Sequence, residues 1–173
     1  METDDERMAM AAAGNDLAAF GRIVRGQQGL LVRFAARMLG GDVSTGEDLA
    51  QEAFLRLWGQ RHDWRAEGNV RAFLLKTVHH LCLDRLRRAG RFVPLDSAPE
   101  PSAPGADPAL ALAVRDAISQ LPDTHRAVFL LSAYDGLTYE EIAGALCLPP
   151  GTVASRKHHA VKMLREHLKD WWE

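Results

Sequence analysis

The segment at residues 90–108, GRFVPLDSAPEPSAPGADP, constrains the fold of this chain more than any other feature. It holds five of the eight prolines and shows no apolar periodicity. Proline lacks the N–H group that helices and central strands need, so neither element can run through this segment. We therefore predict an extended linker at residues 91–107, which joins a domain at residues 1–90 to a smaller domain at residues 108–173.

Both domains are predicted to be helical, because apolar residues recur at helical spacing and no stretch of any length alternates as a strand would. In the first domain, one amphipathic segment begins near Leu17 and is interrupted near Gly26 and Gly29. A second apolar stripe then runs from Leu30 until Gly40-Gly41 ends it. The sequence therefore predicts an all-α fold of two small helical domains.

Capping residues mark where several of these helices begin. Ser44 and Glu47 have the spacing of a capping box, in which a hydroxyl and a carboxylate satisfy free backbone N–H groups. Asn69 precedes the last long helix before the linker. After the linker, Asp107 followed by Pro108 favours a helix start, because proline suits the first helical position.

Charge is segregated along the chain, although the formal net charge is only -2. Six lysines and arginines lie between Arg71 and Arg91, against the single acid Asp84, whereas the first twenty residues are mainly acidic. A chain with so little net charge has no general attraction for nucleic acid. Any binding to DNA must therefore use local basic patches such as this one.

The cysteines and the apolar runs indicate an intracellular chain. Cys82 and Cys147 lie far apart, each within an apolar helical pattern, so we expect reduced, buried thiols rather than a disulfide. The acidic N-terminus lacks the features of a signal peptide, and no apolar run approaches the length of a membrane span. We expect a cytoplasmic protein without membrane insertion.

The strongest local signal is the stretch from Leu137 to Lys162, LTYEEIAGALCLPPGTVASRKHHAVK. A short helix opened by a capping box at Thr138–Glu141, a turn and a second helix form the pattern of a helix-turn-helix. Such a second helix fits the major groove of DNA, where it contacts base edges and phosphates. The alternative is a helical hairpin that packs on a partner. The predicted outward side chains of the second helix are Ser155, Arg156, His158, His159, Lys162 and Arg165.

Three segments, taken in order, resemble the bacterial sigma factors of the extracytoplasmic-function (ECF) group. The stretch EDLAQEAFLRLW at residues 47–58 is similar to the segment by which these factors grip the clamp helices of RNA polymerase. The stretch VRAFLLKTVHHLCLDRLRR at residues 70–88 is similar to their helix for the promoter −10 element. The stretch ISQLPDTHRAVFLLSAYDGLTYEEIAGAL, with GTVASRKHHA, resembles their domain for the −35 element. The resemblance implies a sigma-70 region 2 domain, a linker and a region 4 domain.

The resemblance also implies three sets of binding residues. Those expected to meet the polymerase clamp are Asp48, Gln51, Glu52 and Phe54. Those expected at the −10 element are Arg61, Trp64, Arg71, Lys76, His80, Arg85, Arg87 and Arg88. Those expected at the −35 element are Thr152, Ser155, Arg156, His158, His159 and Lys162. Trp64 would stack on an unpaired base, with simple packing in its loop as the alternative.

Four residues depart from the family pattern. His80 stands where asparagine is usual, and Lys157 stands where leucine is usual. Ala154 and His159 occupy positions that arginine often fills. We therefore expect promoter contacts that are fewer than usual or aimed differently, and a Lys157 side chain that buries its stem while its ammonium escapes.

The residues favour a binding protein over an enzyme. The chain has no phosphate-binding glycine loop, nucleophile elbow or paired catalytic carboxylates. The pairs His79-His80 and His158-His159 point apart on a helix, so we expect neither a metal nor a cofactor. The resemblance implies a transcription initiation factor whose partners are bacterial core RNA polymerase, promoter DNA and an anti-sigma factor. An autonomous helix-turn-helix regulator, and a decoy that only binds an anti-sigma factor, are the alternatives.

Overall fold

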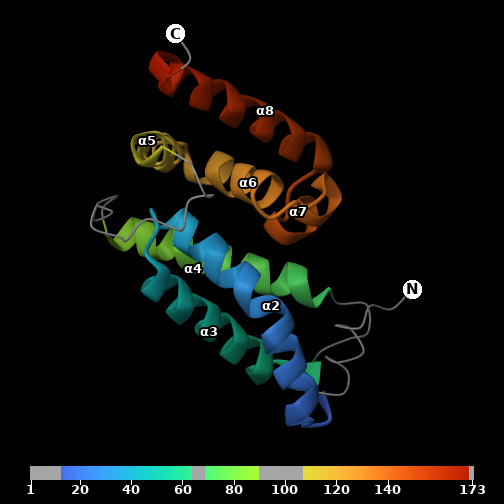
Figure 1. The fold of residues 1–173 in the computed structure, drawn as a ribbon. Coiled ribbons are helices and arrows are strands. Elements are labelled where there is room, and N and C mark those ends of the chain that lie inside the picture. Colours follow the sequence, from blue (N-terminus) through green and yellow to red (C-terminus); the bar gives the residue numbers. More distant parts are fainter. Residues whose placement is uncertain (1–12, 64–68, 90–106, 172–173) are drawn as a thin grey trace.

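A computed structural model of the chain describes residues 13–63, 69–89 and 107–171. Within these residues every regular element is helical, which confirms the predicted all-α class (Figure 1). The predicted linker lies outside the described residues except for Asp107. The elements are, in order, α2 (Leu17–Met38), α3 (Val43–Gly59), the 3₁₀ turn η1 (Arg61–Asp63), α4 (Val70–Arg88), α5 (Pro108–Ser119), α6 (Asp123–Ala133), α7 (Tyr139–Leu146), α8 (Pro150–His167) and the 3₁₀ turn η2 (Lys169–Trp171).

The helices α2, α3 and α4 pack together around buried apolar side chains that include Ile23, Phe34 and Leu74. The backbones of α2 and α3 come very close at Gly46, where an added Cβ would lie 2.9 Å from the carbonyl oxygen of Val32. Only a residue without a side chain fits this crossing. Each large apolar side chain buried here contributes roughly 1.5–3 kcal/mol to folding, so packing fixes these helices more than helix propensity does.

The predicted interruption of the first helix is wrong, because α2 runs without a break through Gly26 and Gly29. Both glycines lie on the exposed side of the helix. Each costs about 1 kcal/mol relative to alanine inside a helix. The complete burial of Ile23, Leu31 and Phe34 on the opposite side outweighs that cost. Tertiary packing, which local sequence does not reveal, therefore keeps the helix continuous.

Three predicted helix starts are confirmed by their capping bonds. The side-chain oxygens of Asn69 and Asp107 each accept a backbone N–H group of the following helix at 2.9 Å. Thr138 and Glu141 make both bonds of the predicted capping box at the start of α7. These bonds satisfy donors that the first turn of a helix leaves without a partner.

The start of α3 is displaced from its prediction. The helix begins at Val43, and its cap is Asp42 rather than Ser44. The Asp42 carboxylate accepts the N–H group of Thr45 at 2.9 Å and the hydroxyl of Thr45 at 2.6 Å. These two bonds lower the pKa of the Asp42 carboxyl group, because they favour its charged form. An aspartate two residues earlier therefore takes the role expected of the serine.

The helices α7 and α8 form the predicted helix-turn-helix, and both pack on α6. Ile142, Val153 and Ala160 form its inner face and are fully buried. Leu148 in the turn is only half-buried. The second helix begins at Pro150, whose fixed φ and missing N–H group suit the first helical position.

The prediction that both cysteines are buried is wrong for Cys147. Cys82 is fully buried within α4, and burial raises the pKa of its thiol to about 12. Cys147 follows the last residue of α7 with a φ of 53°, in the left-handed conformation that ends the helix. The helical periodicity stops at Leu146, so the Cys147 side chain turns out to solvent.

The N-terminal group of helices, α2 to α4, lies directly against the C-terminal group, α5 to α8 (Figure 1). The helix α4 packs along α7, and α2 packs against α6. A single cluster of buried apolar side chains extends through both groups. The two halves of the sequence are thus joined in space through α2 and α4. No helix in the described part of the chain is long and apolar enough to cross a membrane.

Candidate nucleic-acid and protein interfaces

A groove of about 690 Å³ lies between α2 and α3. Part of its apolar lining comes from Phe20 of α2 and Trp58 of α3, whose ring centroids are 4.9 Å apart. Leu17 and Leu55 also line this groove, with exposed fractions of 71% and 60%. Large apolar side chains exposed beside a groove mark a surface for a protein partner. Sequence reasoning missed both leucines. The signal that could have found them is that each lies outside the apolar stripe of its helix.

Three of the four residues predicted to bind polymerase line this groove. Asp48 and Gln51 are exposed, whereas Phe54 is buried and contributes apolar surface beneath them. Glu52 does not line the groove, and its carboxylate accepts the Nε–H of Arg56 at 2.9 Å one turn later. The groove therefore combines an apolar floor with the carboxylate of Asp48 and the amide of Gln51.

Arg61, predicted at the −10 element, is tied to the end of α3. Its Nη1 donates to the carbonyl oxygen of Trp58 at 2.9 Å, and its Nε donates to Oδ1 of Asn15 at 2.8 Å. The guanidinium carbon lies 4.2 Å from the centroid of a Trp58 ring, a cation–π contact. These contacts hold Arg61 against the end of α3. Trp64 lies outside the described residues.

The helix α4 carries most of the described basic residues predicted at the −10 element. Lys76 and His80 are exposed four residues apart, which places them on one face of the helix. Three arginines are exposed in the last turn, where positive charge also favours the helix dipole. These are Arg85, Arg87 and Arg88. Nη1 of Arg87 lies 3.1 Å from the carboxylate of Asp84, a surface pair that water screens.

Arg71 and His79 connect α4 to the C-terminal helices. Nη1 of Arg71 lies 3.8 Å from the carboxylate of Glu141 at the start of α7. His79 is buried, and this burial lowers its pKa to about 4. Two charged residues of the C-terminal helices also act on the pKa of His79: Asp123 raises it and Arg156 lowers it. Sequence reasoning missed His79 as an interface residue, because its helix alone does not show what covers it.

The predicted −35 residues all lie on α8. Those that are exposed are Ser155, His158, His159 and Lys162, and those that are half-buried are Thr152 and Arg156. The ammonium of Lys157 lies 5.3 Å from the ring centroid of Tyr139, so an aromatic face holds its charge. The chain segments described contain no group of three or more His, Cys, Asp or Glu side chains arranged to hold a metal ion.

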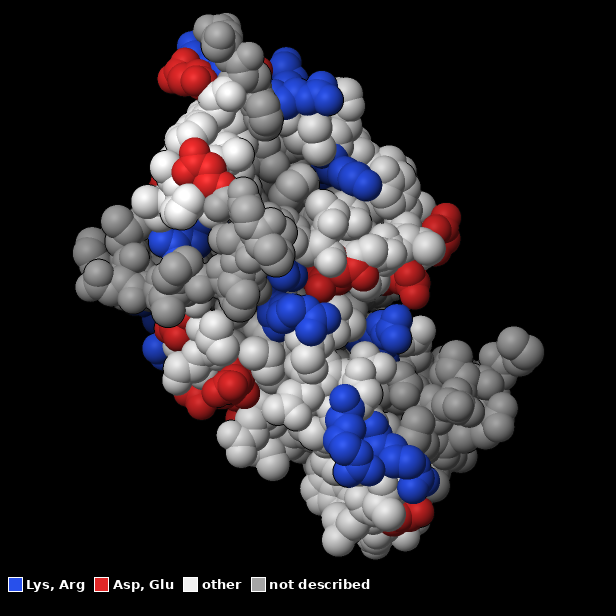
Figure 2. Space-filling model, viewed as in Figure 1, with Lys and Arg blue, Asp and Glu red and all other residues white. Residues whose placement is uncertain are grey.

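Figure 2 shows lysine and arginine side chains gathered over the part of the surface where α2 lies in Figure 1. The sequence of α2 contains no aspartate or glutamate. Its exposed arginines are Arg22, Arg25 and Arg33. Sequence reasoning missed this basic face, because charge was counted over the first twenty residues and from Arg71 to Arg91, and the three arginines lie between those segments. Counting charges along the helix instead would have revealed it.

Two family models match this arrangement of helices. Sigma-70 region 2 matches residues 23–92, and Sigma-70 region 4 matches residues 111–164. The first match includes α3 and α4, and the second includes α6, α7 and almost all of α8. Together they define a chain of the sigma-70 class, with region 2 before region 4 along the sequence.

Similar proteins narrow this class. The ECF RNA polymerase sigma factor SigE of Mycolicibacterium smegmatis is 32% identical over 184 residues, which cover 97% of this chain and 70% of SigE. The ECF RNA polymerase sigma factor SigL of Mycobacterium tuberculosis is 35% identical over 150 residues, covering 82% of this chain and 84% of SigL. The chain belongs to the ECF group of RNA polymerase sigma factors.

Solved structures have the same fold. CnrH, in its complex with the cytosolic domain of CnrY, is 26% identical with a TM-score of 0.75, and the match covers 97% of this chain and 99% of CnrH. The sigma factor RpoE of Bartonella quintana, in complex with the anti-sigma factor NepR, is 24% identical with a TM-score of 0.69. That match covers 87% of this chain and 96% of RpoE. The fold is therefore shared over nearly the whole chain.

Proposed function

We propose that this ECF sigma factor binds core RNA polymerase through the groove between α2 and α3 and directs it to specific promoters. The groove carries the proposal, because it presents exposed Leu17 and Leu55 beside Asp48 and Gln51. A partner surface with apolar and basic side chains would bury the leucines and pair with the acid. The resemblance leads us to expect Asp48 and Gln51 at the polymerase, and the exposed leucines support the same surface independently.

Two DNA-binding surfaces complete the proposed function. The exposed basic residues of α4 suit the −10 element, where lysine and arginine would hold phosphates around unpaired bases. The outward face of α8 suits the −35 element, because the second helix of a helix-turn-helix enters the major groove. The imidazoles of His158 and His159 then stand where base edges would be read. The net charge of -2 gives the free protein little affinity for DNA, so polymerase must supply the rest.

We also propose a cytoplasmic location and control by an anti-sigma factor. Polymerase and promoter DNA both reside in the bacterial cytoplasm, which fixes where such a factor works. CnrH was solved with a second chain, the cytosolic domain of CnrY, bound to it. A comparable regulator of this chain would act by covering its polymerase and DNA surfaces. The protein would exert all of these effects by binding, without a catalytic step of its own.

Transcription with purified components tests the proposal. The protein would be mixed with bacterial core RNA polymerase and a library of upstream regions from its own genome, and transcript start sites would be mapped. We expect discrete start sites, and their loss with Asp48→Arg, because a cation in the groove rim would repel a basic partner surface. Asp170→Arg is the matched control, since Asp170 is exposed in η2, far along the chain from the groove.

Each outcome has a clear meaning. Start sites that survive Asp48→Arg would overturn the assignment of the groove. Tight operator binding by the protein alone, with no transcripts when polymerase is added, would establish an autonomous regulator instead. Tight binding of an anti-sigma factor without transcripts would establish a decoy.

A further inference from the structure

The exposed face of α2 carries a row of arginines. Arg22, Arg25 and Arg33 are exposed, and the helix contains no aspartate or glutamate. Exposed Gly26 and Gly29 lie between them, and all five positions have the spacing of a single helix face. Figure 2 shows lysine and arginine side chains over the region where α2 lies in Figure 1. The row from Arg22 to Arg33 is about 16 Å long, because an α-helix rises 1.5 Å per residue.

Within the part of the chain that the structure describes, none of these three arginines forms an ion pair. The fourth arginine of α2 is different, because Nη1 of Arg37 lies 3.5 Å from Oδ1 of Asp135. Like charges on one helix face repel each other, and an anionic partner relieves that repulsion. The whole chain has a formal net charge of -2, so the α2 face is a local basic patch on a slightly acidic molecule.

The two glycines leave the helix surface between the arginines open. A Cβ at Gly29 would lie 3.1 Å from Nη1 of Arg33, so this guanidinium lies over the glycine, back along the helix. A Cβ at Gly26 would meet no atom within 4 Å, so no packing in the described structure requires glycine there. Glycine weakens a helix relative to alanine, but it lets a partner approach the backbone closely. The face therefore suits a partner that lies against the helix between the charged side chains.

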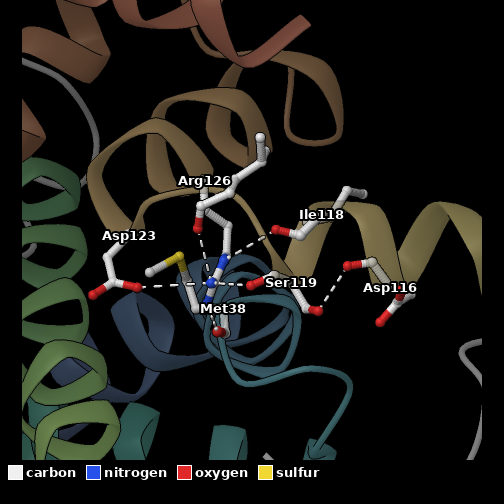
Figure 3. A network of polar contacts seen from close by, with 7 residues as sticks. Met38, Asp116, Ile118, Ser119, Asp123 and Arg126 are labelled. Atoms are coloured by element: carbon white, nitrogen blue, oxygen red, sulfur yellow. Dashed lines mark hydrogen bonds and ion pairs between the residues drawn. The ribbon is translucent and has the colours of Figure 1, made fainter. Parts of the chain in front are cut away.

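The helix that carries the row is held at both ends. At its start, the carboxylate of Asp16 accepts the N–H groups of Ala18 and Ala19 at 2.9 and 3.0 Å. At its end, the carbonyl oxygen of Met38 accepts an N–H of Nη1 of buried Arg126 at 2.9 Å (Figure 3). A binding surface on a fixed helix loses less conformational freedom when its partner binds. The arginines therefore present their charges from a rigid support.

The chemistry of this face favours duplex DNA over other anionic partners. A protein interface buries an apolar centre, whereas the residues between these arginines are glycines. Unpaired nucleic acid is held by aromatic side chains that stack on its bases, and the row contains none. Duplex DNA needs only cations near its phosphates, and about five phosphates of one strand fall within the length of the row. The planar guanidinium also matches the geometry of a phosphate group.

The arginine row and the groove between α2 and α3 use different residues of α2. The groove is lined from α2 by Leu17, Phe20, Val24 and Gln28, and none of the three arginines lines it. A partner in the groove therefore leaves the row accessible, so the two surfaces can be occupied at the same time.

We propose that Arg22, Arg25 and Arg33 bind the phosphate backbone of duplex promoter DNA beside the −10 element, while the groove holds polymerase. This inference rests on the proposed function, which brings promoter DNA to the N-terminal group of helices. Because α2 packs on α4, the duplex at its face adjoins the DNA that the basic residues of α4 hold. Phosphates are the same at every base pair, so the contact adds affinity for all promoters and carries no sequence information.

Salt titrations of the complex with polymerase on labelled duplex promoters test this contact. Each phosphate contact that is lost lowers the magnitude of the slope of log K against log salt by about 0.9. We therefore expect the triple variant Arg22→Gln, Arg25→Gln, Arg33→Gln to lower it by about 3, and each single variant by about 1, equally for promoters of different sequence. Lys169→Gln removes one charge in η2 and is the control that should leave the slope unchanged. Circular dichroism establishes that each variant is folded.

Two further measurements identify the partner of the row. A single-stranded −10 oligonucleotide offers no duplex to α2, so the triple variant and the reference protein should bind it equally well in complex with polymerase. Gly26→Cys, labelled with a photoreactive group in a Cys147→Ser background, should cross-link to duplex DNA, because Gly26 lies between the arginines. Cys82 is buried and escapes the label. Gln28→Cys, which lines the groove, should cross-link to polymerase instead.

A slope that the triple variant leaves unchanged would overturn the contact with DNA. An equal loss of binding to the single-stranded oligonucleotide would overturn its assignment to duplex DNA, and cross-links from Gly26→Cys to protein alone would assign the row to an acidic protein surface. The free chain separates these outcomes from failure of the proposed function. At low salt, the triple variant should bind duplex DNA of arbitrary sequence several-fold more weakly than the reference protein, without any polymerase. That loss, combined with an absence of promoter-specific transcripts, would count against the proposed function alone.

Discussion

The Nη1 of Arg126 donates to the carbonyl oxygen of Met38 at 2.9 Å, across a separation of 88 residues in the sequence. The same guanidinium donates to the carbonyls of Ile118 and Leu121, at the end of α5 and in the turn before α6. Because only 6% of Arg126 is exposed, water cannot replace these bonds in the folded molecule. A single side chain thus sets the geometry of the C-terminal helices and their position against α2.

Replacing Arg126 with alanine should destabilise the folded protein by about 3–5 kcal/mol, because several buried carbonyl groups would lose a charged donor at once. Urea denaturation followed by circular dichroism measures this change. Arg165→Ala is the control, since Arg165 is exposed on α8 and its loss should change stability by less than about 0.5 kcal/mol. A loss below about 1 kcal/mol for Arg126→Ala would show that water or a neighbouring side chain replaces the guanidinium.

The crossing of α2 and α3 predicts opposite effects for two glycine substitutions. Gly46→Ala should destabilise the protein by roughly 1–3 kcal/mol, because the new Cβ would lie 2.9 Å from the Val32 carbonyl oxygen and 3.1 Å from the Ala36 nitrogen. Gly26→Ala meets no atom within 4 Å and should stabilise α2 by about 0.5–1 kcal/mol. Thermal melting of both variants separates a steric effect from a general preference for alanine. Two changes of the same sign would contradict the close crossing.

Local sequence predicted the helices well where a cap or a stripe decides the structure. Asn69, Asp107 and Thr138 each cap the helix expected of them, because a capping bond needs only neighbouring residues. The break expected at Gly26 and the buried environment expected for Cys147 are wrong for a different reason. Burial against other helices keeps α2 continuous through Gly26. Cys147 is exposed because α7 ends at the residue before it.

The binding surfaces were predictable only in part. Asp48 and Gln51 of α3 were expected from the family pattern, whereas Leu17 lines the groove from α2 and was not expected. Arg126 was not predicted at all, since its partners lie on α5, the following turn and α2. Its only sequence signal is an arginine directly before the apolar run from Ala127 to Leu131. The roles of individual residues in binding DNA and polymerase stay predictions.

The buried imidazole of His79 predicts that stability falls as the solution is acidified. Its pKa is lowered from 6.5 to about 4, chiefly by burial, so the folded state disfavours the charged form. The unfolded chain therefore binds more protons below pH 6.5, and stability is lost between pH 6.5 and about 4. This loss of stability should reach roughly 2 kcal/mol at pH 5. The charged groups that act on it are His80 on its own helix, and Asp123 and Arg156 on the C-terminal helices.

Denaturation of the reference protein and of His79→Leu between pH 7 and pH 5 isolates this effect. In His79→Leu, the free energy of unfolding should change much less between pH 7 and pH 5, because leucine has a similar volume to histidine and cannot be protonated. His167→Leu is the control, since His167 is exposed at the end of α8. Equal pH dependence in the reference protein and in His79→Leu would assign the effect to other groups, such as His125, whose pKa burial also lowers.

The exposed ammonium of Lys162 predicts a contact to the phosphate backbone rather than to a base. It lies on the outward face of α8, two turns after the first exposed residue of the predicted −35 set, Ser155. Lys162→Ala should therefore weaken promoter binding by the polymerase complex to a similar extent for all −35 sequences, and lower the slope of log K against log salt by about 1. Lys169→Ala, in η2 beyond the end of that helix, should leave the slope unchanged. Titrations of labelled promoter DNA at several salt concentrations give the slope, and a loss confined to one −35 sequence would instead assign Lys162 to base recognition.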